Sequence, residues 1–100
     1  MPKALSGLRI LDLSVALSGP FCGMILADQG ADVIKVESPD SDPFRSMAPY
    51  YRGEWSSYFV AIQRNKRDIV LDLKTESGRQ ALYDLVKISD VVLDLSLIHI

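Results

Sequence analysis

The sequence predicts an α/β fold that is Rossmann-like, with a parallel sheet and flanking helices. Short apolar runs with the length of buried strands alternate with helical patterns, in the order strand, helix, strand, connection, strand, helix, strand. The strand–helix–strand connections have the length of parallel crossovers. Ligands of such folds bind at the carboxyl ends of the strands, so the residues that follow each strand are the first candidates for a site.

The first strand–helix–strand unit is expected within residues 8–36. Leu8 to Leu13 is a short apolar run that predicts a buried strand. Residues 18–20 (Ser-Gly-Pro) turn into a helix, because proline is tolerated in a first turn, where its missing N–H would be unpaired. Phe21 to Asp28 is apolar on most faces and predicts a largely buried helix that Gly30 ends. Val33 to Val36 is expected to form the second strand.

A long connection without a regular pattern follows. It runs from Ser38 to Ser57 and contains Pro39, Pro43 and Pro49. Loops of this length in compact domains are usually functional or mobile. Tyr58 to Ile62 is apolar and aromatic but short, and its pattern fits a strand and a helical turn equally well.

The second unit begins at Asp68 to Leu73, which predicts a third strand. Thr75 is a suitable N-cap for the next helix, and Glu76 places negative charge in the first turn, where the helix dipole favours it. The apolar stripe of that helix is Ala81, Leu82, Leu85, Val86 and Ile88. Val91 to Leu95 predicts a fourth strand.

The composition narrows the class of protein. The chain has 100 residues, enough for one domain or part of one, and its 48% hydrophobic and 24% charged residues are ordinary for a soluble globular protein. A net charge of −2 and a pI of about 5.2 argue against a general nucleic-acid binder. The lone cysteine excludes an internal disulfide. Arg9 and Asp12 interrupt the first apolar stretch, so we expect no secretory leader, no membrane partner and a cytoplasmic location.

The turn formed by residues 17–20 is the first candidate binding element. It joins a strand to a helix N-terminus, where free backbone N–H groups attract anions such as phosphate, and Gly19 allows close approach of a ligand. The alternative is a plain tight turn. A GxGxxG dinucleotide fingerprint is absent from the sequence.

Cations flank the third strand on both sides. Arg64, Lys66 and Arg67 precede it and Lys74 follows it, so the four side chains are expected at opposite ends and cannot all hold one ligand. Lys74 is better placed for phosphate, because it follows the carboxyl end. The alternative for the run of three cations is a solvated positive edge.

Other polar residues carry weaker signals. Asp12, Asp72 and Asp94 lie near strand ends without a partner at a recognisable catalytic spacing, so they are expected to be solvated or to cap helices. Cys22 is expected to be a small core residue. His99 stands alone, and the sequence contains no metal-ligand cluster.

Four blocks in order resemble the N-terminal part of the class III CoA-transferases, the formyl-CoA and carnitine-CoA transferase family. They are LSGLRILDLS, SGPFCGMILADQGADVIKVE, RNKRDIVLDLKT and GRQALYDLVKISDVVL, and they extend from Leu5 to about Asp94. The resemblance implies a CoA-binding Rossmann-like domain, here a truncated part of a larger fold in which two chains interlock as a homodimer. It also implies acyl-CoA and carboxylic acid substrates, coenzyme A as the only cofactor and no metal. In that family an aspartate accepts the acyl group as an anhydride and exchanges it through an enzyme–CoA thioester.

The resemblance places CoA contacts at three positions of this chain. The turn after the first strand matches Leu17 and Ser18, and the end of the second strand matches Ser38. Some members have arginine at that second position, so serine removes a possible phosphate contact. The nucleotide side matches Leu71, Asp72, Leu73 and Lys74.

The chain departs from the family in two ways. The nucleophilic aspartate lies beyond residue 100 in the family, so no catalytic residue is assigned here and the chain alone is expected to be inactive. Asp94 falls where the family has the glutamate of an ENFRPG phrase, and the next residues do not match it. Residues 1–94 are therefore expected to be the N-terminal part of the CoA-binding domain and 95–100 a non-native or atypical tail. Two alternatives stay open: an acyl-CoA racemase or epimerase of the same family, and a non-catalytic nucleotide-binding or interaction module.

Overall fold

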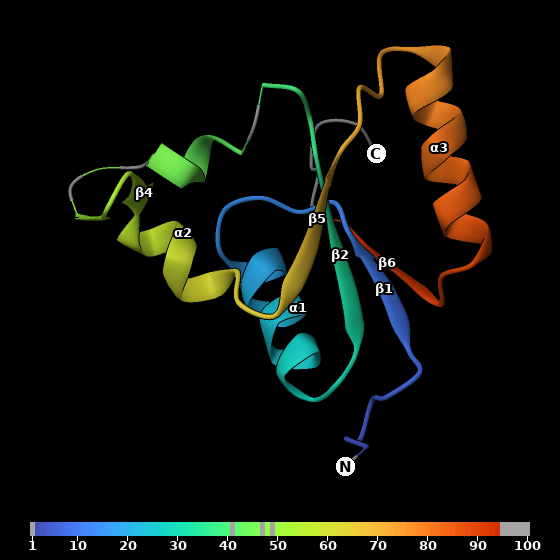
Figure 1. The fold of residues 1–100 in the computed structure, drawn as a ribbon, viewed down its shortest axis with the longest axis horizontal. Helices are drawn as coiled ribbons and strands as arrows, with labels where there is room; N and C mark the ends of the chain where they lie inside the picture. Colours follow the sequence, from blue (N-terminus) through green and yellow to red (C-terminus); the bar gives the residue numbers. More distant parts are fainter. Residues whose placement is uncertain (1, 41, 47, 49, 95–100) are drawn as a thin grey trace.

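The computed structural model describes residues 2–94 apart from 41, 47 and 49, and all statements below concern this part of the chain (Figure 1). The expected tail at 95–100, with His99 and the end of the last strand, lies outside the described residues. The elements are β1 (Arg9–Asp12), α1 (Ser18–Asp28), β2 (Asp32–Glu37), the 3-10 helix η1 (Pro43–Ser46), β3 (Tyr51–Arg52), β4 (Trp55–Ser56), α2 (Ser57–Ile62), β5 (Lys66–Val70), α3 (Glu76–Lys87) and β6 (Val91–Leu93).

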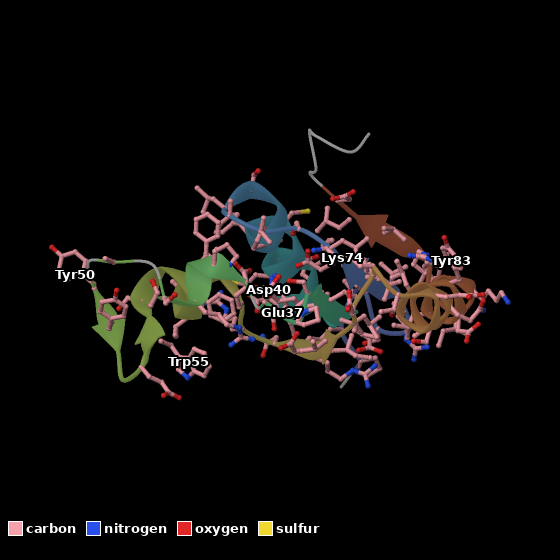
Figure 2. The ribbon with its side chains drawn as sticks, turned by 90° about the horizontal axis from the view of Figure 1, so that it is seen from above. Glu37, Asp40, Tyr50, Trp55, Lys74 and Tyr83 are labelled. Atoms are coloured by element: carbon pink, nitrogen blue, oxygen red, sulfur yellow. The ribbon has the colours of Figure 1, made fainter. Side chains whose placement is uncertain are left out.

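Four of these strands form one parallel sheet, which confirms the predicted α/β class. Their order is β5-β2-β1-β6, and Leu11 of β1 pairs with Ile34 of β2 and Val92 of β6. Helices α1 and α3 lie on opposite sides of the sheet in both views (Figures 1 and 2). No helix in the described part is long and apolar enough to cross a membrane.

The core lies between the sheet and the inner face of α1. Ile10 and Val33 are 0% and 1% exposed and pack with Ala27 and Ala31. Burying each of the two larger side chains stabilises the fold by about 1.5–3 kcal/mol. The central strands are thus the best-packed part of the structure.

Helix α1 ends as predicted but is not buried on most faces. Gly30 follows the helix with a φ of +104°, a conformation that favours glycine. The prediction of a largely buried helix is wrong for its outer face, where Phe21 and Ile25 are 46% and 41% exposed. Cys22 is also exposed, so the expectation of a core cysteine is wrong. The reason is that only the inner face of α1 meets the sheet in the described part.

The connection after β2 contains regular structure that its sequence pattern did not predict. Besides η1, it holds an antiparallel hairpin in which Tyr51 pairs with Ser56 and Arg52 with Trp55. Strands of two residues are too short to show alternation, so sequence periodicity cannot reveal them. The ambiguous run at 58–62 is helical, as the end of α2.

The third predicted strand is displaced toward the N-terminus. β5 contains Lys66 and Arg67 and ends at Val70, so the prediction of a strand through Leu73 is wrong at both ends. The chain leaves the sheet because Asp72 forms a turn, its carboxylate accepting a hydrogen bond from the Lys74 backbone N–H at 3.0 Å. The next helix begins as predicted, with the Thr75 hydroxyl accepting from the Gly78 N–H at 3.0 Å.

Candidate functional site

A cavity of about 520 Å³ lies at the carboxyl ends of β1, β2 and β5. Its walls are Leu13 and Val15 after β1, residues 35–40 along and after β2, residues 42–43 at the start of η1, and residues 71–74 after β5. Figure 2 shows Glu37, Asp40 and Lys74 near one another when this edge of the sheet is viewed from above. Ligands of open α/β sheets bind at this edge.

The cavity brings together most of the residues that the sequence singled out. Its lining includes Ser38, Leu71, Asp72, Leu73 and Lys74. The strands that precede these residues, β2 and β5, are paired in parallel, which is why Ser38 and the 71–74 segment meet.

Leu17 and Ser18 are not part of this lining. Leu17 precedes α1, is 52% exposed and makes no side-chain cap, and Ser18 is the first residue of the helix. The first backbone N–H groups of a helix have no partner within the helix. This helix start is therefore a separate candidate anion contact beside the cavity.

The two lysines of the cavity differ in burial and in whether their ammonium groups already have partners. Lys35 is buried, and its ammonium lies 2.9 Å from Asp42 Oδ2 and donates to the Ser14 carbonyl oxygen at 3.3 Å. Lys74 is exposed, and its side chain takes part in none of the ion pairs of the described residues. Of the two lysines that line the cavity in the described part of the chain, Lys74 is thus the one whose ammonium is available for an incoming anion.

The first turn of α3 holds the 71–74 segment. The Thr75 hydroxyl donates to the Asp72 carbonyl oxygen at 2.8 Å, and Arg79 donates to the Leu73 carbonyl oxygen at 3.1 Å. A Cβ on Gly78 would stand 1.9 Å from the Asp72 carbonyl oxygen, so a glycine is required there. Gly78 was not predicted from the sequence, although a glycine within a first helical turn is a signal of close backbone approach.

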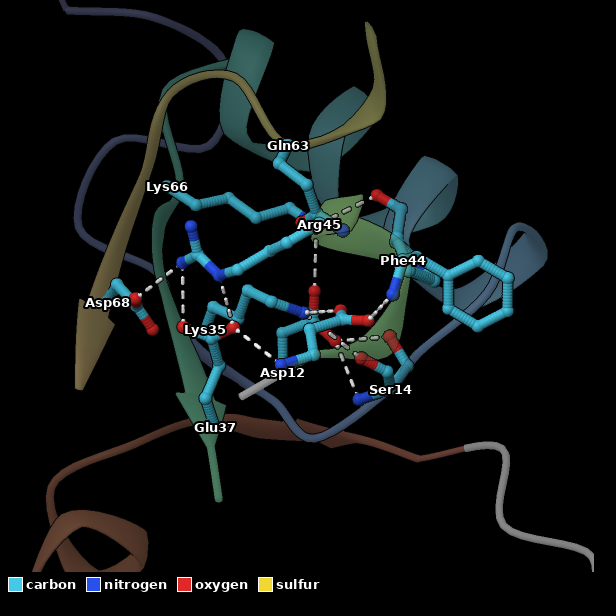
Figure 3. A network of polar contacts seen from close by, with 11 residues as sticks. Asp12, Ser14, Lys35, Glu37, Phe44, Arg45, Gln63, Lys66 and Asp68 are labelled. Carbon is cyan, nitrogen blue, oxygen red and sulfur yellow. Dashed lines mark hydrogen bonds and ion pairs between the residues drawn. The ribbon is translucent and has the colours of Figure 1, made fainter. Parts of the chain in front are cut away.

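A buried polar network lies below the cavity (Figure 3). Asp12 is 0% exposed, and its Oδ2 lies 2.8 Å from Lys66 Nζ. Its Oδ1 accepts from both the backbone N–H and the hydroxyl of Ser14. The Lys66 ammonium also donates to the carbonyl oxygen of Pro20 at 2.9 Å and to Gln63 Oε1 at 2.7 Å. Burial lowers the pKa of Lys66, and Asp12 opposes that shift.

These contacts correct one expectation from the sequence and divide another. Asp12 is neither solvated nor a helix cap but half of a buried ion pair. Arg64 and Arg67 are exposed, as the solvated-edge alternative expects, and they pair with Asp28 and Asp32, both at 2.7 Å, whereas Lys66 between them is buried. Each cation has its own carboxylate, so the cluster is not a phosphate cradle. Asp72 is half-buried, and its carboxylate stabilises the turn before α3, whose N-cap is Thr75. Asp94 is exposed.

Arg45 of η1 joins two carboxylates from neighbouring strands. Its Nε and Nη2 donate to the two oxygens of Glu37 at 2.8 and 2.7 Å, and Nη2 donates to Asp68 at 3.0 Å. The Arg45 guanidinium lowers the pKa of Glu37 to about 2. Burial and the neighbouring Glu37 raise the pKa of Asp68 to about 6. This cluster was not predicted from the sequence, because its members come from three separate elements.

The arrangement is suited to binding. Glu37 and Asp42 line the cavity but are already engaged by Arg45 and Lys35. Among the described residues, no group of three or more His, Cys, Asp or Glu side chains could hold a metal ion. The cavity combines apolar walls with one free ammonium, as expected for a ligand that has both apolar and anionic parts.

Comparison with known proteins gives concordant matches. A family model described as CoA-transferase family III matches residues 5–96. The chain is 45% identical over 95 residues to the succinyl-CoA:mesaconate CoA-transferase of Haloarcula hispanica, a match that covers 91% of the chain and 24% of that relative. It is 42% identical over 94 residues to the formyl-CoA:oxalate CoA-transferase of Streptomyces avermitilis, covering 94% of the chain and 23% of that relative.

Solved structures agree with these matches. The crystal structure of a CAIB/BAIF family protein from Brucella suis superposes with a TM-score of 0.87 at 41% sequence identity. That superposition covers 94% of the chain and 26% of the Brucella protein. The chain thus spans about a quarter of the length of the curated relatives and of the structure that it matches.

Proposed function

The chain belongs to CoA-transferase family III, and we propose that it supplies part of the CoA site of an enzyme that moves CoA from an acyl-CoA thioester to a carboxylic acid. The observation that carries this proposal is the cavity at the carboxyl edge of the sheet, where Ser38 meets residues 71–74. We call the longer polypeptide to which these residues would belong the parent enzyme, because the curated relatives are about four times longer than the match.

In this proposal, different residues contact different parts of the CoA molecule. Lys74 offers its free ammonium to a phosphate, and the N–H groups at the start of α3 lie close by. Leu71, Asp72 and Leu73 border the nucleotide. Leu17 and Ser18 present the start of α1 as a second anion contact, and Ser38 contributes a neutral hydroxyl at the end of β2.

The chemistry would come from a carboxylate outside this chain. In the proposed reaction an aspartate attacks the thioester carbonyl carbon, the carbon–sulfur bond breaks, and CoA leaves as a thiolate while an acyl-aspartyl anhydride remains. The CoA thiolate then attacks the aspartyl carbonyl carbon of the anhydride, so that the donor carboxylate leaves and an enzyme–CoA thioester forms. The acceptor carboxylate attacks this thioester, which releases the thiolate and forms a second anhydride. Attack of the thiolate on the acceptor's carbonyl carbon yields the new acyl-CoA and frees the aspartate. Two of the described carboxylates at the cavity, Glu37 and Asp42, do not fit this role, because they are neutralised by Arg45 and Lys35.

The proposal extends to the whole protein. We place the parent enzyme in the cytoplasm as a homodimer, and we expect the 100-residue chain alone to have no transferase activity. The names of the relatives support transfer over racemisation, since those reported above are CoA-transferases.

Two measurements on the purified parent enzyme test the proposal. Isothermal titration should show saturable binding of CoA. Incubation of succinyl-CoA with a panel of carboxylic acids should yield a new acyl-CoA, without exchange of the α-proton in deuterated buffer. Absence of CoA binding would contradict the proposal, and α-proton exchange without CoA transfer would identify a racemase.

A further inference from the structure

One wall of the cavity is built by a segment that leaves the sheet directly after β2. Its contributions are Pro39, Asp40, Asp42 and Pro43. No residue of η1, which continues this segment, is fully buried. Polar contacts tie the segment to β2, including the Asp42 N–H, which donates to Glu37 Oε1 at 3.2 Å.

Arg45 makes the largest number of the polar contacts described for this segment. Its two parallel hydrogen bonds to the Glu37 carboxylate form a fork, and it also donates to Asp68. In addition, its guanidinium carbon lies 4.4 Å from the ring centre of Phe59 and 4.9 Å from that of Trp55. Aromatic faces attract a guanidinium and restrict its orientation. Contacts from two strands, which Figure 3 shows, and from the hairpin and α2 therefore hold the side chain in place.

The contact between Arg45 and Glu37 determines one of the charges at the cavity, beside those of Asp40, Asp72 and Lys74. Glu37 lines the cavity, and with a pKa of about 2 it is ionised at every physiological pH. Arg45 neutralises it at 2.7–2.8 Å. Without the guanidinium, a bare carboxylate would face a ligand that carries phosphates, and like charges repel across several ångströms in a partly buried site.

We infer that Arg45 is a positioning residue that makes the cavity selective for a phosphate-bearing ligand, by neutralising Glu37 and holding its carboxylate away from the phosphates. This inference rests on the proposed function, because it takes the ligand to be CoA. It concerns a residue that does not line the cavity and acts only through Glu37.

The test compares CoA with pantetheine, which lacks the phosphates and the adenosine of CoA, in the parent enzyme. Arg45→Met should raise the Kd of CoA about tenfold, the size expected for one unscreened charge in a partly buried site. The Kd of pantetheine, measured by competition, should stay within about twofold. Arg45→Met combined with Glu37→Gln should recover most of the CoA affinity, because the repelling charge is gone. Asp68→Asn, which keeps the fork on Glu37, should leave CoA binding unchanged.

The outcomes separate this inference from the proposed function. If the unmodified parent enzyme does not bind CoA, both fail. If it binds CoA but Arg45→Met weakens both ligands equally, or the double variant is no better than the single one, Arg45 is only structural and the inference is overturned. If Arg45→Met does not fold, the Glu37→Gln variant alone tests the inference. It should lower the Kd of CoA several-fold and leave the Kd of pantetheine unchanged. An unchanged CoA affinity in that variant would overturn the inference.

Discussion

Asp12 and Lys66 lie 54 positions apart in the sequence, yet their carboxylate and ammonium groups are 2.8 Å apart and both side chains are almost completely buried. The pair ties β1 to β5, which are not neighbours in the sheet. Gly23 of α1 makes room for it, because a Cβ there would stand 2.9 Å from Asp12 Oδ2. Helix α1 can therefore approach the sheet only with a glycine at this point.

Breaking this pair should strongly destabilise the protein. Lys66→Met leaves a buried carboxylate without its cation, which typically lowers the free energy of unfolding by about 3–5 kcal/mol. Arg67→Met is the matched control on the same strand. Its pair with Asp32 is largely exposed, so it should cost about 0–1 kcal/mol. Urea unfolding of the parent enzyme measures the loss of stability in both variants. Equal losses would contradict the prediction that the buried pair contributes more to stability than the exposed one.

Gly78 should matter for the cavity as well as for stability. Gly78→Ala forces the first turn of α3 and the Asp72 carbonyl oxygen apart, since the new Cβ would be 1.9 Å from that oxygen. The 71–74 segment must then move, so we expect weaker CoA binding together with a loss of about 2 kcal/mol or more in stability. Ser77→Ala, in the same turn but exposed, should change neither. Titration with CoA and thermal unfolding check this, and normal CoA affinity in Gly78→Ala would contradict it.

Sequence patterns predicted the sheet because its central strands are buried. Ile10, Leu11 and Val33 belong to apolar runs that only a covered strand explains. The displaced end of β5 shows the limit of that signal, since Leu71 and Leu73 prolong the apolar run while the Asp72 turn ends the strand. Propensity alone does not tell a run that continues a strand from one that lines a cavity.

The candidate site was predictable where it depends on strand ends and not where it depends on long-range pairs. Ser38 and Lys74 follow neighbouring parallel strands, so their proximity follows from the fold class. The fork of Arg45 on Glu37 depends on how the connection folds back. Likewise, the sequence pattern placed Lys66 in a cluster of cations. Its buried ion pair could not be predicted, because its partner Asp12 lies on another strand.

Asp68 should make stability fall as pH rises from about 4 to about 6. Its pKa is raised to about 6, so between these values the folded state binds more protons than the unfolded state, and its contribution is lost as pH rises. Asp68→Asn removes this loss and should stabilise the parent enzyme above pH 6, by about 1 kcal/mol after discounting for solvent screening. Glu37 has the opposite effect in a lower pH range, because its pKa is lowered. Its contribution to the free energy of unfolding is fully present above about pH 4.5 and is lost as the pH falls toward 2.

The measurement is the melting temperature at pH 5, 6 and 7. The advantage of Asp68→Asn over the unmodified protein should grow across this series, while Asp84→Asn on the exposed face of α3 should show no such trend. An Asp68→Asn variant that is less stable at pH 7 would mean that its bond to Arg45 outweighs the repulsion from Glu37.

The isolated 100-residue chain should associate with itself. The outer face of α1 exposes Phe21 and Ile25, and the edge strand β6 exposes Val91 and Val92 at 42% and 46%. Exposed apolar patches and open strand edges both favour association. Sedimentation should show oligomers, and Phe21→Ser with Ile25→Ser should reduce them. A monomer with a sharp cooperative melt would contradict this prediction.

Lys74 should contribute more to CoA binding than any other exposed lysine of the chain. It lines the cavity and follows β5, and its ammonium forms no ion pair among the described residues. An exposed lysine–phosphate contact is worth about 1 kcal/mol, so Lys74→Ala should raise the Kd of CoA several-fold. It should also flatten the salt dependence of binding, because one charge contact is lost. Lys87→Ala is the control, since Lys87 lies at the far end of α3 near Asp84. Titration of the parent enzyme with CoA at two ionic strengths measures both effects, and equal, negligible changes in the two variants would reduce Lys74 to ordinary surface charge.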